Sequence, residues 1–156
     1  MKLNQEAQLL GRGFYWQDLH VGEKFRTYRR TVTEADLVNF ISTIGMLEAV
    51  FIDAAFEHAA LSNRPVPAML TSGLIEGMLC QTMVQGTGLA LLEMSIKAFK
   101  PVVVNDAIHG VVEVVEVRPT SKNNRAVFAS RVDVFNQEDV NVLTYDVKRM
   151  LAGRPD

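Results

Sequence analysis

The pattern of apolar and polar positions divides the chain into a helical first half and a strand-rich second half. Apolar residues recur at helical spacing after Thr33, which predicts a helix over residues 34–44. Thr33 and Asp36 have the spacing of a capping box, and Gly45 is suited to end the helix. Asp53 is the expected cap of a second, short helix that runs to about residue 60.

Residues 68–85 form the most informative predicted helix, because apolar side chains occur on nearly all of its sides. A helix with this pattern is expected to be buried. Gly73 and Gly77 each lower helix propensity by about 1 kcal/mol relative to Ala, and their spacing indicates close packing against a neighbour. The apolar positions are Leu70, Leu74 and Met78 on one side, Ile75 and Leu79 on the opposite side, and Met83 near the rest.

Alternating apolar and polar residues predict an early strand near residues 24–32 and four strands in the second half of the chain. These four cover residues 91–99, 107–117, 126–135 and 140–150. The turns between them are short, which favours antiparallel hairpins. The predicted fold class is therefore α+β, a hot-dog fold: an antiparallel sheet wrapped around a central helix, with an extra helical segment before it. The uncovered edges of such a sheet also predict a two-fold homodimer.

Composition and charge exclude several classes of protein. The chain of 156 residues suits one domain, which we place at residues 14–151 between tails at 1–13 and 152–156. A net charge of −2 argues against a nucleic-acid-binding surface. Cys80 is the only cysteine, so no disulfide can form within the chain, and a cytoplasmic location is expected. No apolar run approaches the ~18 residues of a membrane span.

Five segments resemble, in order, those of the MaoC-like hydratases, so the resemblance spans residues 14–151. Their order and spacing together make it specific. Residues 14–23 resemble the opening "F-x-D-(L/F)-x-V-G", residues 31–40 the helix start "TVTEADIxxF", residues 66–71 the segment "A-H/P-G-M-L-T" that opens the central helix, residues 99–106 "F-x-x-P-V-x-x-G-D", and residues 132–137 "V-x-N-Q-x-G".

The resemblance implies an acyl-CoA thioester ligand, usually an (R)-hydroxyacyl or trans-enoyl species, and a homodimer without a cofactor. The family's hydratases carry "G-D-x-N-P-x-H" after the first helix, and its Asp and His act as a paired general acid and base. In this chain Met46 stands at the Asp position, Glu48 at the Asn position and Phe51 at the His position. Neither Met nor Phe can transfer a proton, so the standard dyad is absent.

Two carboxylates remain as candidate catalytic groups. Glu48 is the only ionisable residue of the altered loop, where apolar neighbours would raise its pKa toward that of a general base; alternatively it points into water. Glu76 lies on the central helix, where related hot-dog thioesterases place a carboxylate. The alternative for Glu76 is an ion pair across a dimer or a position at the edge of the helix.

Several other polar residues have structural interpretations. His20, His58 and His109 are scattered and lack metal-ligand spacing, so no metal site is expected. Cys80 is expected to be a small buried residue of the central helix.

The start of the central helix is the expected binding site for the thioester. The free N–H groups of Ala68, Met69 and Leu70 could hold a thioester oxygen, and Met46 and Phe51 are expected to line the same site. Cations that could meet the CoA phosphates, or lie at solvated strand ends, are Lys97, Lys100, Arg118, Lys122 and Arg125.

Three functions therefore remain. The first is an acyl-CoA hydratase or dehydratase that uses the variant loop. The second is a catalytically silent acyl-CoA-binding hot-dog protein, or the partner subunit of an active one. The third is an acyl-CoA thioesterase that uses Glu76.

Overall fold

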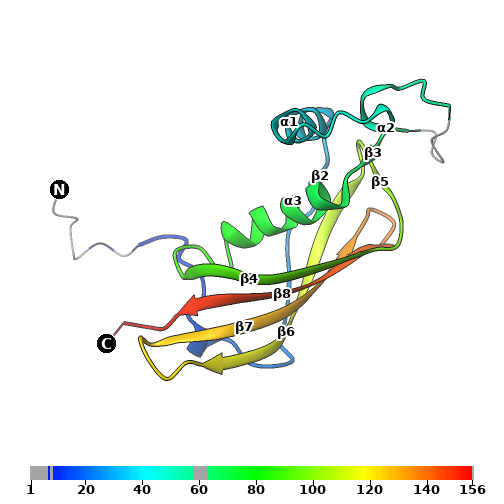
Figure 1. Ribbon diagram of the computed structural model, residues 1–156. Helices are drawn as coiled ribbons and strands as arrows, with labels where there is room; N and C mark the ends of the chain where they lie inside the picture. The colour runs from blue at the N-terminus through cyan, green and yellow to red at the C-terminus, as the bar shows by residue number, and fades with distance from the viewer. Residues whose placement is uncertain (1–6, 8, 58–62, 156) are drawn as a thin grey trace.

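The structure is a computed structural model that describes residue 7, residues 9–57 and residues 63–155. A long antiparallel sheet curves around one helix, α3, which crosses its inner face (Figure 1). The helices are η1 (Trp16–Asp18), α1 (Glu34–Ile44), α2 (Ala49–Ile52) and α3 (Ala68–Cys80). The strands are β1 (Lys24–Arg26), β2 (Arg30–Thr31), β3 (Pro65–Val66), β4 (Gly88–Ala98), β5 (Val102–Val103), β6 (Ala107–Pro119), β7 (Arg125–Phe135) and β8 (Asn141–Ala152).

The sheet has the strand order β1-β6-β7-β8-β4, and each of these neighbouring pairs is antiparallel. The four strands predicted from residue 91 onward are confirmed, with ends that differ by at most three residues. The predicted strand near residues 24–32 is interrupted: β1 and β2 both pair with β6, but residues 27–29 between them are irregular. Strands β3 and β5 form a separate small ladder next to the start of α3.

The core lies between α3 and the inner face of the sheet. Ile75 of α3 is fully buried and packs over Gly110 of β6, where an added Cβ would come within 2.8 Å of the Ile75 side chain. A larger residue at position 110 would therefore push α3 away from the sheet. The buried partners on the sheet include Ile108, Val112 and Val114 of β6, Phe128, Val132 and Val134 of β7, and Leu143, Tyr145, Val147 and Leu151 of β8.

Helix α3 is shorter and less buried than predicted. It ends at Cys80 rather than residue 85, and the chain then turns while Met83 and Val84 remain in the core. One side of the helix faces away from the chain: Met69 is 51% exposed, and Gly73 and Cys80 are also exposed. The prediction of a helix buried on all sides is therefore wrong for a single chain, as is that of a buried Cys80. The apolar pattern of α3 predicts that other residues pack against it, but it does not show whether those residues belong to the same chain or to another subunit.

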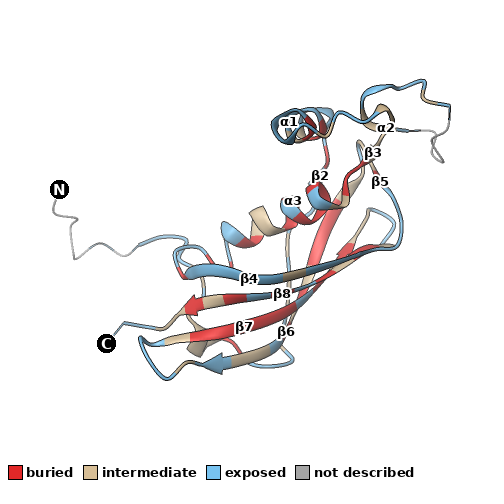
Figure 2. Cartoon of the chain, in the orientation of Figure 1, coloured by how far each residue is buried: buried red, intermediate tan, exposed pale blue. Residues whose placement is uncertain are grey.

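Strand β4 is an edge of the sheet and is exposed along nearly its whole length (Figure 2). All of its residues are exposed except Met94, which is half-buried. Its large apolar side chains are among them, with Leu89, Leu91 and Leu92 at 50%, 60% and 51% exposure. An exposed strand edge with such side chains is normally covered by another strand.

Helix α1 begins with the predicted capping box. The Thr33 hydroxyl accepts a hydrogen bond from the N–H of Asp36 at 3.1 Å, and the Asp36 carboxylate accepts one from the N–H of Thr33 at 2.8 Å. Gly45 ends the helix in the left-handed conformation, with a φ of 72°.

The second short helix lies earlier than predicted, at Ala49–Ile52. Asp53 follows this helix, and its carboxylate accepts a hydrogen bond from Ala55 N–H in a turn. The prediction of Asp53 as the cap of a helix after it is therefore wrong over the described residues, because an Asp can stabilise a turn after a helix as well as a helix start. The part of the predicted helix at residues 58–60 lies outside the described residues.

The N-terminal segment is joined to the far end of the sheet. The indole N–H of Trp16 donates a hydrogen bond to the side-chain oxygen of Asn124, in the turn between β6 and β7, at 3.2 Å. The N–H of Gly153, just after β8, donates to the carbonyl oxygen of Asn124 at 2.7 Å. Segments from both ends of the chain thus meet at one turn.

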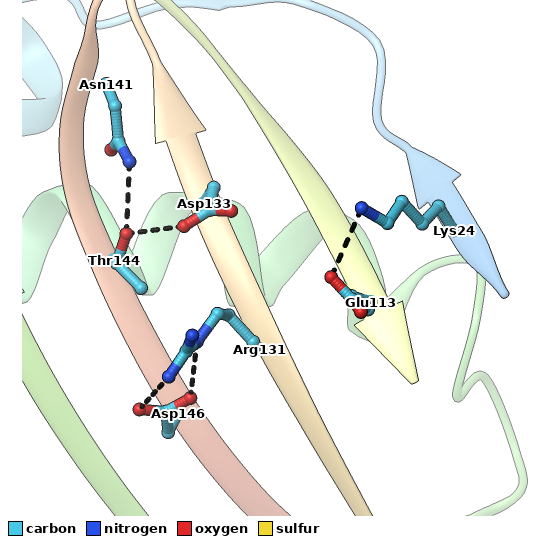
Figure 3. Close-up of polar contacts among 7 residues, drawn as sticks. All are labelled: Lys24, Glu113, Arg131, Asp133, Asn141, Thr144 and Asp146. Carbon is cyan, nitrogen blue, oxygen red and sulfur yellow. Dashed lines mark hydrogen bonds and ion pairs between the residues drawn. The ribbon is translucent and has the colours of Figure 1, made fainter. Parts of the chain in front are cut away.

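The outer face of the sheet, away from α3, carries polar cross-strand contacts (Figure 3). Arg131 of β7 pairs with Asp146 of β8 at 3.0 Å, and Lys24 of β1 pairs with Glu113 of β6 at 3.3 Å. These side chains are substantially exposed to water, so each pair contributes little to stability.

Candidate functional site

A pocket of about 400 Å³ opens at the start of α3. Helix α2 forms one wall, the β3 segment and first turn of α3 form another, and residues 98–102 form a third. The lining residues are Val50, Phe51, Pro65, Val66, Pro67, Ala68, Thr71, Ala98, Phe99, Lys100, Pro101, Val102 and Leu143. Lys100 is the only ionisable residue among them, so the lining is largely apolar and contains no carboxylate.

The N–H groups in the first turn of α3, next to the pocket, have no side-chain cap. Pro67 occupies the N-cap position, and no side-chain hydrogen bond caps the helix there. The N–H of Thr71 is the first that bonds back within the helix, to the carbonyl of Pro67 at 3.0 Å. A helix start with uncapped N–H groups attracts an anion or a carbonyl oxygen.

The residues predicted to bind the thioester are only partly brought together. Phe51 and Ala68 line the pocket, whereas Leu70 is buried in the core and Met69 points to the exposed side of α3. Met46 is half-buried and packs against the core, and its N–H donates to the carbonyl of Ile41 at 2.9 Å. Met46 therefore extends the apolar core beneath the loop and lies outside the pocket lining.

Glu48 occupies the N-cap position of α2, but its carboxylate makes no capping hydrogen bond. The residue is exposed, and in the part of the chain that the structure describes its side chain forms no ion pair. It lies two residues before Val50 and three before Phe51, both of which line the pocket. Its position is therefore close to the pocket wall, with the carboxylate directed to solvent in this single chain.

Arg64 connects the altered loop to α1. No local pattern in the sequence identifies Arg64 as a residue of this site. Its guanidinium donates to the carbonyl of Phe51 at 3.2 Å and also forms an ion pair with Glu34 of α1. The Arg64 side chain is only 20% exposed. This contact fixes the backbone of Phe51 at the pocket wall.

Glu76 is held in a buried polar network between α3 and β8. Arg149 donates two hydrogen bonds to its carboxylate, at 3.0 and 3.1 Å, and the Tyr145 hydroxyl donates a third at 2.7 Å. The side chains of Glu76 and Arg149 are only 20% and 7% exposed. Burial, followed by the charge of Glu76, raises the pKa of Tyr145, so its hydroxyl remains a donor.

These contacts favour the structural interpretation of Glu76 that was predicted beside the catalytic one. The predicted pairing was with another subunit, whereas the observed partner lies in the same chain. A carboxylate that already accepts three hydrogen bonds, two of them from a guanidinium, has little freedom to attack a thioester.

The cations predicted for the CoA phosphates are separated in space. Lys100 lines the pocket, while Lys97 lies beside Arg131 and Asp146 on the outer face of the sheet. Arg118, Lys122 and Arg125 lie at the turn between β6 and β7, close to Asn124 and far along the sheet from β5. Only Lys100 is therefore placed to meet a ligand at the start of α3.

A second cavity, of about 620 Å³, lies at the other end of α3 and was not predicted. It is lined mainly by apolar side chains, including Phe14, Phe25, Leu79 and Met83. The two phenylalanine rings lie 5.2 Å apart. None of the residues predicted for the functional site takes part in it.

Among residues 7, 9–57 and 63–155, no three His, Cys, Asp or Glu side chains cluster closely enough to hold a metal ion. In the same part of the chain, no helix is both long and apolar enough to cross a membrane.

Comparisons with known proteins give structural relatives only. Neither a protein-family model nor a curated protein sequence matches the chain. The fold matches the (R)-hydratase PhaJ1 from Pseudomonas aeruginosa with a TM-score of 0.74 and 26% identity, over 91% of this chain and 88% of that one. It matches the MaoC-like dehydratase from Rhodospirillum rubrum with a TM-score of 0.78 and 21% identity, over 92% of this chain and 100% of that one.

A third match is Rv0216 of Mycobacterium tuberculosis, described as a double hot-dog fold, with a TM-score of 0.77 and 18% identity. It covers 92% of this chain and 46% of that one, as expected if this chain corresponds to one of two hot-dog units. These matches confirm the predicted hot-dog fold and the predicted resemblance.

We expect the Glu76–Arg149 pair to behave as a buried ion pair in urea unfolding experiments. Either Glu76→Leu or Arg149→Leu should lower the free energy of unfolding by about 3 kcal/mol, because each leaves a buried charge without its partner. The double variant should recover most of this loss. Asp146→Asn, which breaks the exposed pair with Arg131, serves as the control and should leave the free energy of unfolding almost unchanged. Additive losses in the double variant would contradict the assignment.

Proposed function

We propose that this chain, which has the hot-dog fold of the MaoC-like dehydratases and (R)-hydratases, binds the thioester end of an acyl-CoA at the start of α3. The observation that carries the proposal is the apolar pocket of about 400 Å³ that lies against an uncapped helix start. The pocket suits an acyl chain, and the free N–H groups of Ala68, Met69 and Leu70 suit a thioester oxygen.

The rim of the pocket supports the same ligand. Lys100 is exposed and is the only charged residue among the described residues of the lining, so it is suited to meet a phosphate of CoA outside the apolar part. No carboxylate occurs among the described residues of the lining, which also favours binding over proton transfer. The Asp and His positions of the family motif hold Met46 and Phe51, and neither side chain can exchange a proton.

Binding is tested by isothermal titration calorimetry with crotonyl-CoA and a longer trans-2-enoyl-CoA. Ala68→Phe should weaken binding at least about tenfold, because the added ring occupies the pocket beside the helix start. The matched control is Ala55→Phe, at an exposed turn residue outside the pocket lining. Equal affinities of the two variants, or no binding by the unaltered protein, would reject this site.

A second candidate function is hydration or dehydration of the bound acyl-CoA, supported by the position of Glu48. This is the only ionisable side chain on the segment of residues 45–52, and it immediately precedes the helix that forms one wall of the pocket. A bound ligand that covers the loop would bring its reacting carbons close to this carboxylate, which can accept a proton.

For this reaction we expect Glu48→Gln to reduce kcat for enoyl-CoA hydration at least about 100-fold while the dissociation constant stays the same, since an amide cannot accept the proton. Glu57→Gln is the control, because Glu57 is exposed and lies beyond α2. Turnover is followed by loss of the enoyl thioester absorbance. Full activity in Glu48→Gln would exclude this role, and no turnover of any enoyl- or hydroxyacyl-CoA would leave binding as the function.

We also propose that the protein is a two-fold homodimer in which β4 pairs with its copy and the exposed side of α3 faces a second α3. Edge strand β4 carries unpaired backbone groups and exposed leucines, and an added Cβ at Gly73 or Gly77 meets no atom within 4 Å. Both features leave room for a second copy of the chain.

Light scattering should give twice the mass of one 17.4 kDa chain, from an interface that buries over ~1,000 Å² in total. Leu91→Asp should shift the protein to the monomer, because it puts a charge on each side of the symmetric edge. Val115→Asp is the control, at a residue of β6 that is similarly exposed but separated from β4 by β7 and β8. A monomer that still binds acyl-CoA would refute the proposal.

A further inference from the structure

The irregular segment between β1 and β2 forms a bulge on the outer face of the sheet. Arg26 lies opposite Val111 and Arg30 lies opposite Ile108, so residues 27–29 stand against only two residues of β6. Thr27 closes the bulge, because its N–H donates to the carbonyl of Gly110 and its hydroxyl accepts from the N–H of Gly110, both at 2.9 Å. Bulges of this kind redirect side chains and are frequent next to functional sites.

A cavity of about 440 Å³ lies at this bulge. Its lining residues are Arg26, Thr27, Tyr28, Arg29 and His109. Gly110 faces α3, so the neighbouring His109 lies on the opposite face of the sheet. The cavity is therefore separate from the acyl pocket and contains two guanidinium groups and an imidazole, with no carboxylate in its lining.

His109 is a buried polar group without a partner. Its side chain is only 7% exposed, and its ring stacks on Phe135 with 5.6 Å between ring centroids. Its Nδ1 atom is buried and has no hydrogen-bond partner among the described residues. A buried polar atom without a partner destabilises the folded protein, so a bound group that accepts a hydrogen bond from the imidazole would be stabilising.

The positive charge around His109 is only partly balanced. Most arginines of the chain pair with a carboxylate, but Arg26 forms no hydrogen bond or ion pair through its side chain with any described residue. Arg29 pairs with Asp139 at 3.4 Å, and both side chains are largely exposed. Burial, Arg29 and Arg26 lower the pKa of His109, and Asp139 opposes them.

We propose that Arg26, Arg29 and His109 form a binding site for a phosphate-type anion on the outer face of the sheet. The guanidinium groups supply charge and paired donors, and the imidazole supplies a nitrogen that has no partner among the described residues. The anion is either free phosphate or the phosphate of a larger ligand such as CoA, and the chemistry of recognition is the same for both.

Inorganic phosphate is the first probe, followed through the side-chain ¹⁵N resonances of His109. Phosphate should shift these resonances with saturation and leave those of exposed His20 unchanged. CoA tests the second source: tighter binding than phosphate at the same resonances identifies CoA, and equal binding identifies free phosphate. Either result supports the site. No shift of the His109 resonances with either probe would overturn it.

The Arg26→Gln and Arg29→Gln variants should each weaken phosphate binding about tenfold or more, as expected for loss of a charge-assisted hydrogen bond. Arg131→Gln is the matched control, because Arg131 lies on the same face of the sheet and already pairs with Asp146 (Figure 3). An equal loss in Arg131→Gln would mean that only the net charge matters, and would overturn the site.

The pH dependence of anion binding is measured with sulfate, because sulfate keeps its charge between pH 5 and 8. The charges facing His109 are those of Arg26, Arg29 and Asp139. A bound anion favours the protonated imidazole, so sulfate should raise the pKa of His109 and bind more tightly as the pH falls. A pKa of His109 that sulfate does not change would contradict direct contact.

The site is also tested independently of the acyl pocket. An N-acetylcysteamine thioester carries the acyl group but no phosphate, and its binding should be unchanged in Arg26→Gln. Loss of phosphate binding together with intact thioester binding supports two separate sites. Loss of both in Arg26→Gln would reject a site separate from the acyl pocket.

Discussion

The buried contact between Glu76 and the pair Arg149 and Tyr145 fixes helix α3 on the sheet. Apolar packing alone tolerates small shifts, but three hydrogen bonds to one carboxylate require one position along the helix and one rotation about it. A shift by one helical turn, ~5.4 Å, would leave two buried charges apart, which costs several kcal/mol. Ile75, the residue before Glu76, is held over Gly110 in the same register.

The position of the functional site follows from that register. With α3 fixed, its first turn meets the segment at residues 98–102 and the short ladder of β3 and β5, and these enclose the pocket. The loop that would supply a proton-transfer dyad in a hydratase instead supplies Met46 to the core and Phe51 to the pocket wall. Arg64 holds the backbone of Phe51 from outside. The apolar side chains of the loop thus pack against the core and the pocket wall. Its one carboxylate, Glu48, lies outside this packed region.

Most of the fold could be predicted from local patterns, because strand alternation and helix caps depend on neighbouring residues. Thr33 and Asp36 identified the start of α1, and the alternation around Val132 and Tyr145 identified the inner face of the sheet. The partner of Glu76 could not be predicted, since Arg149 is 73 residues away and nothing near either residue specifies the pairing. The exposed side of α3 was missed for another reason. The apolar and small residues that suit a core also suit an interface, and a single sequence does not distinguish the two. The bulge at residues 27–29 was missed because β1 and β2, on either side of it, each still read as part of a strand. One extra residue between them leaves no clear signal in the pattern of apolar and polar residues.

The hydrogen bond between Trp16 and Asn124 joins residues 108 positions apart in the chain. The hairpins of β6, β7 and β8, in contrast, form from residues that are close in sequence, so their loops close at a lower entropic cost. During folding, the meander from Ala107 to Ala152 can therefore form before the N-terminal segment docks on its turn. Trp16 is the only tryptophan of the protein, so we expect its fluorescence to follow this docking step.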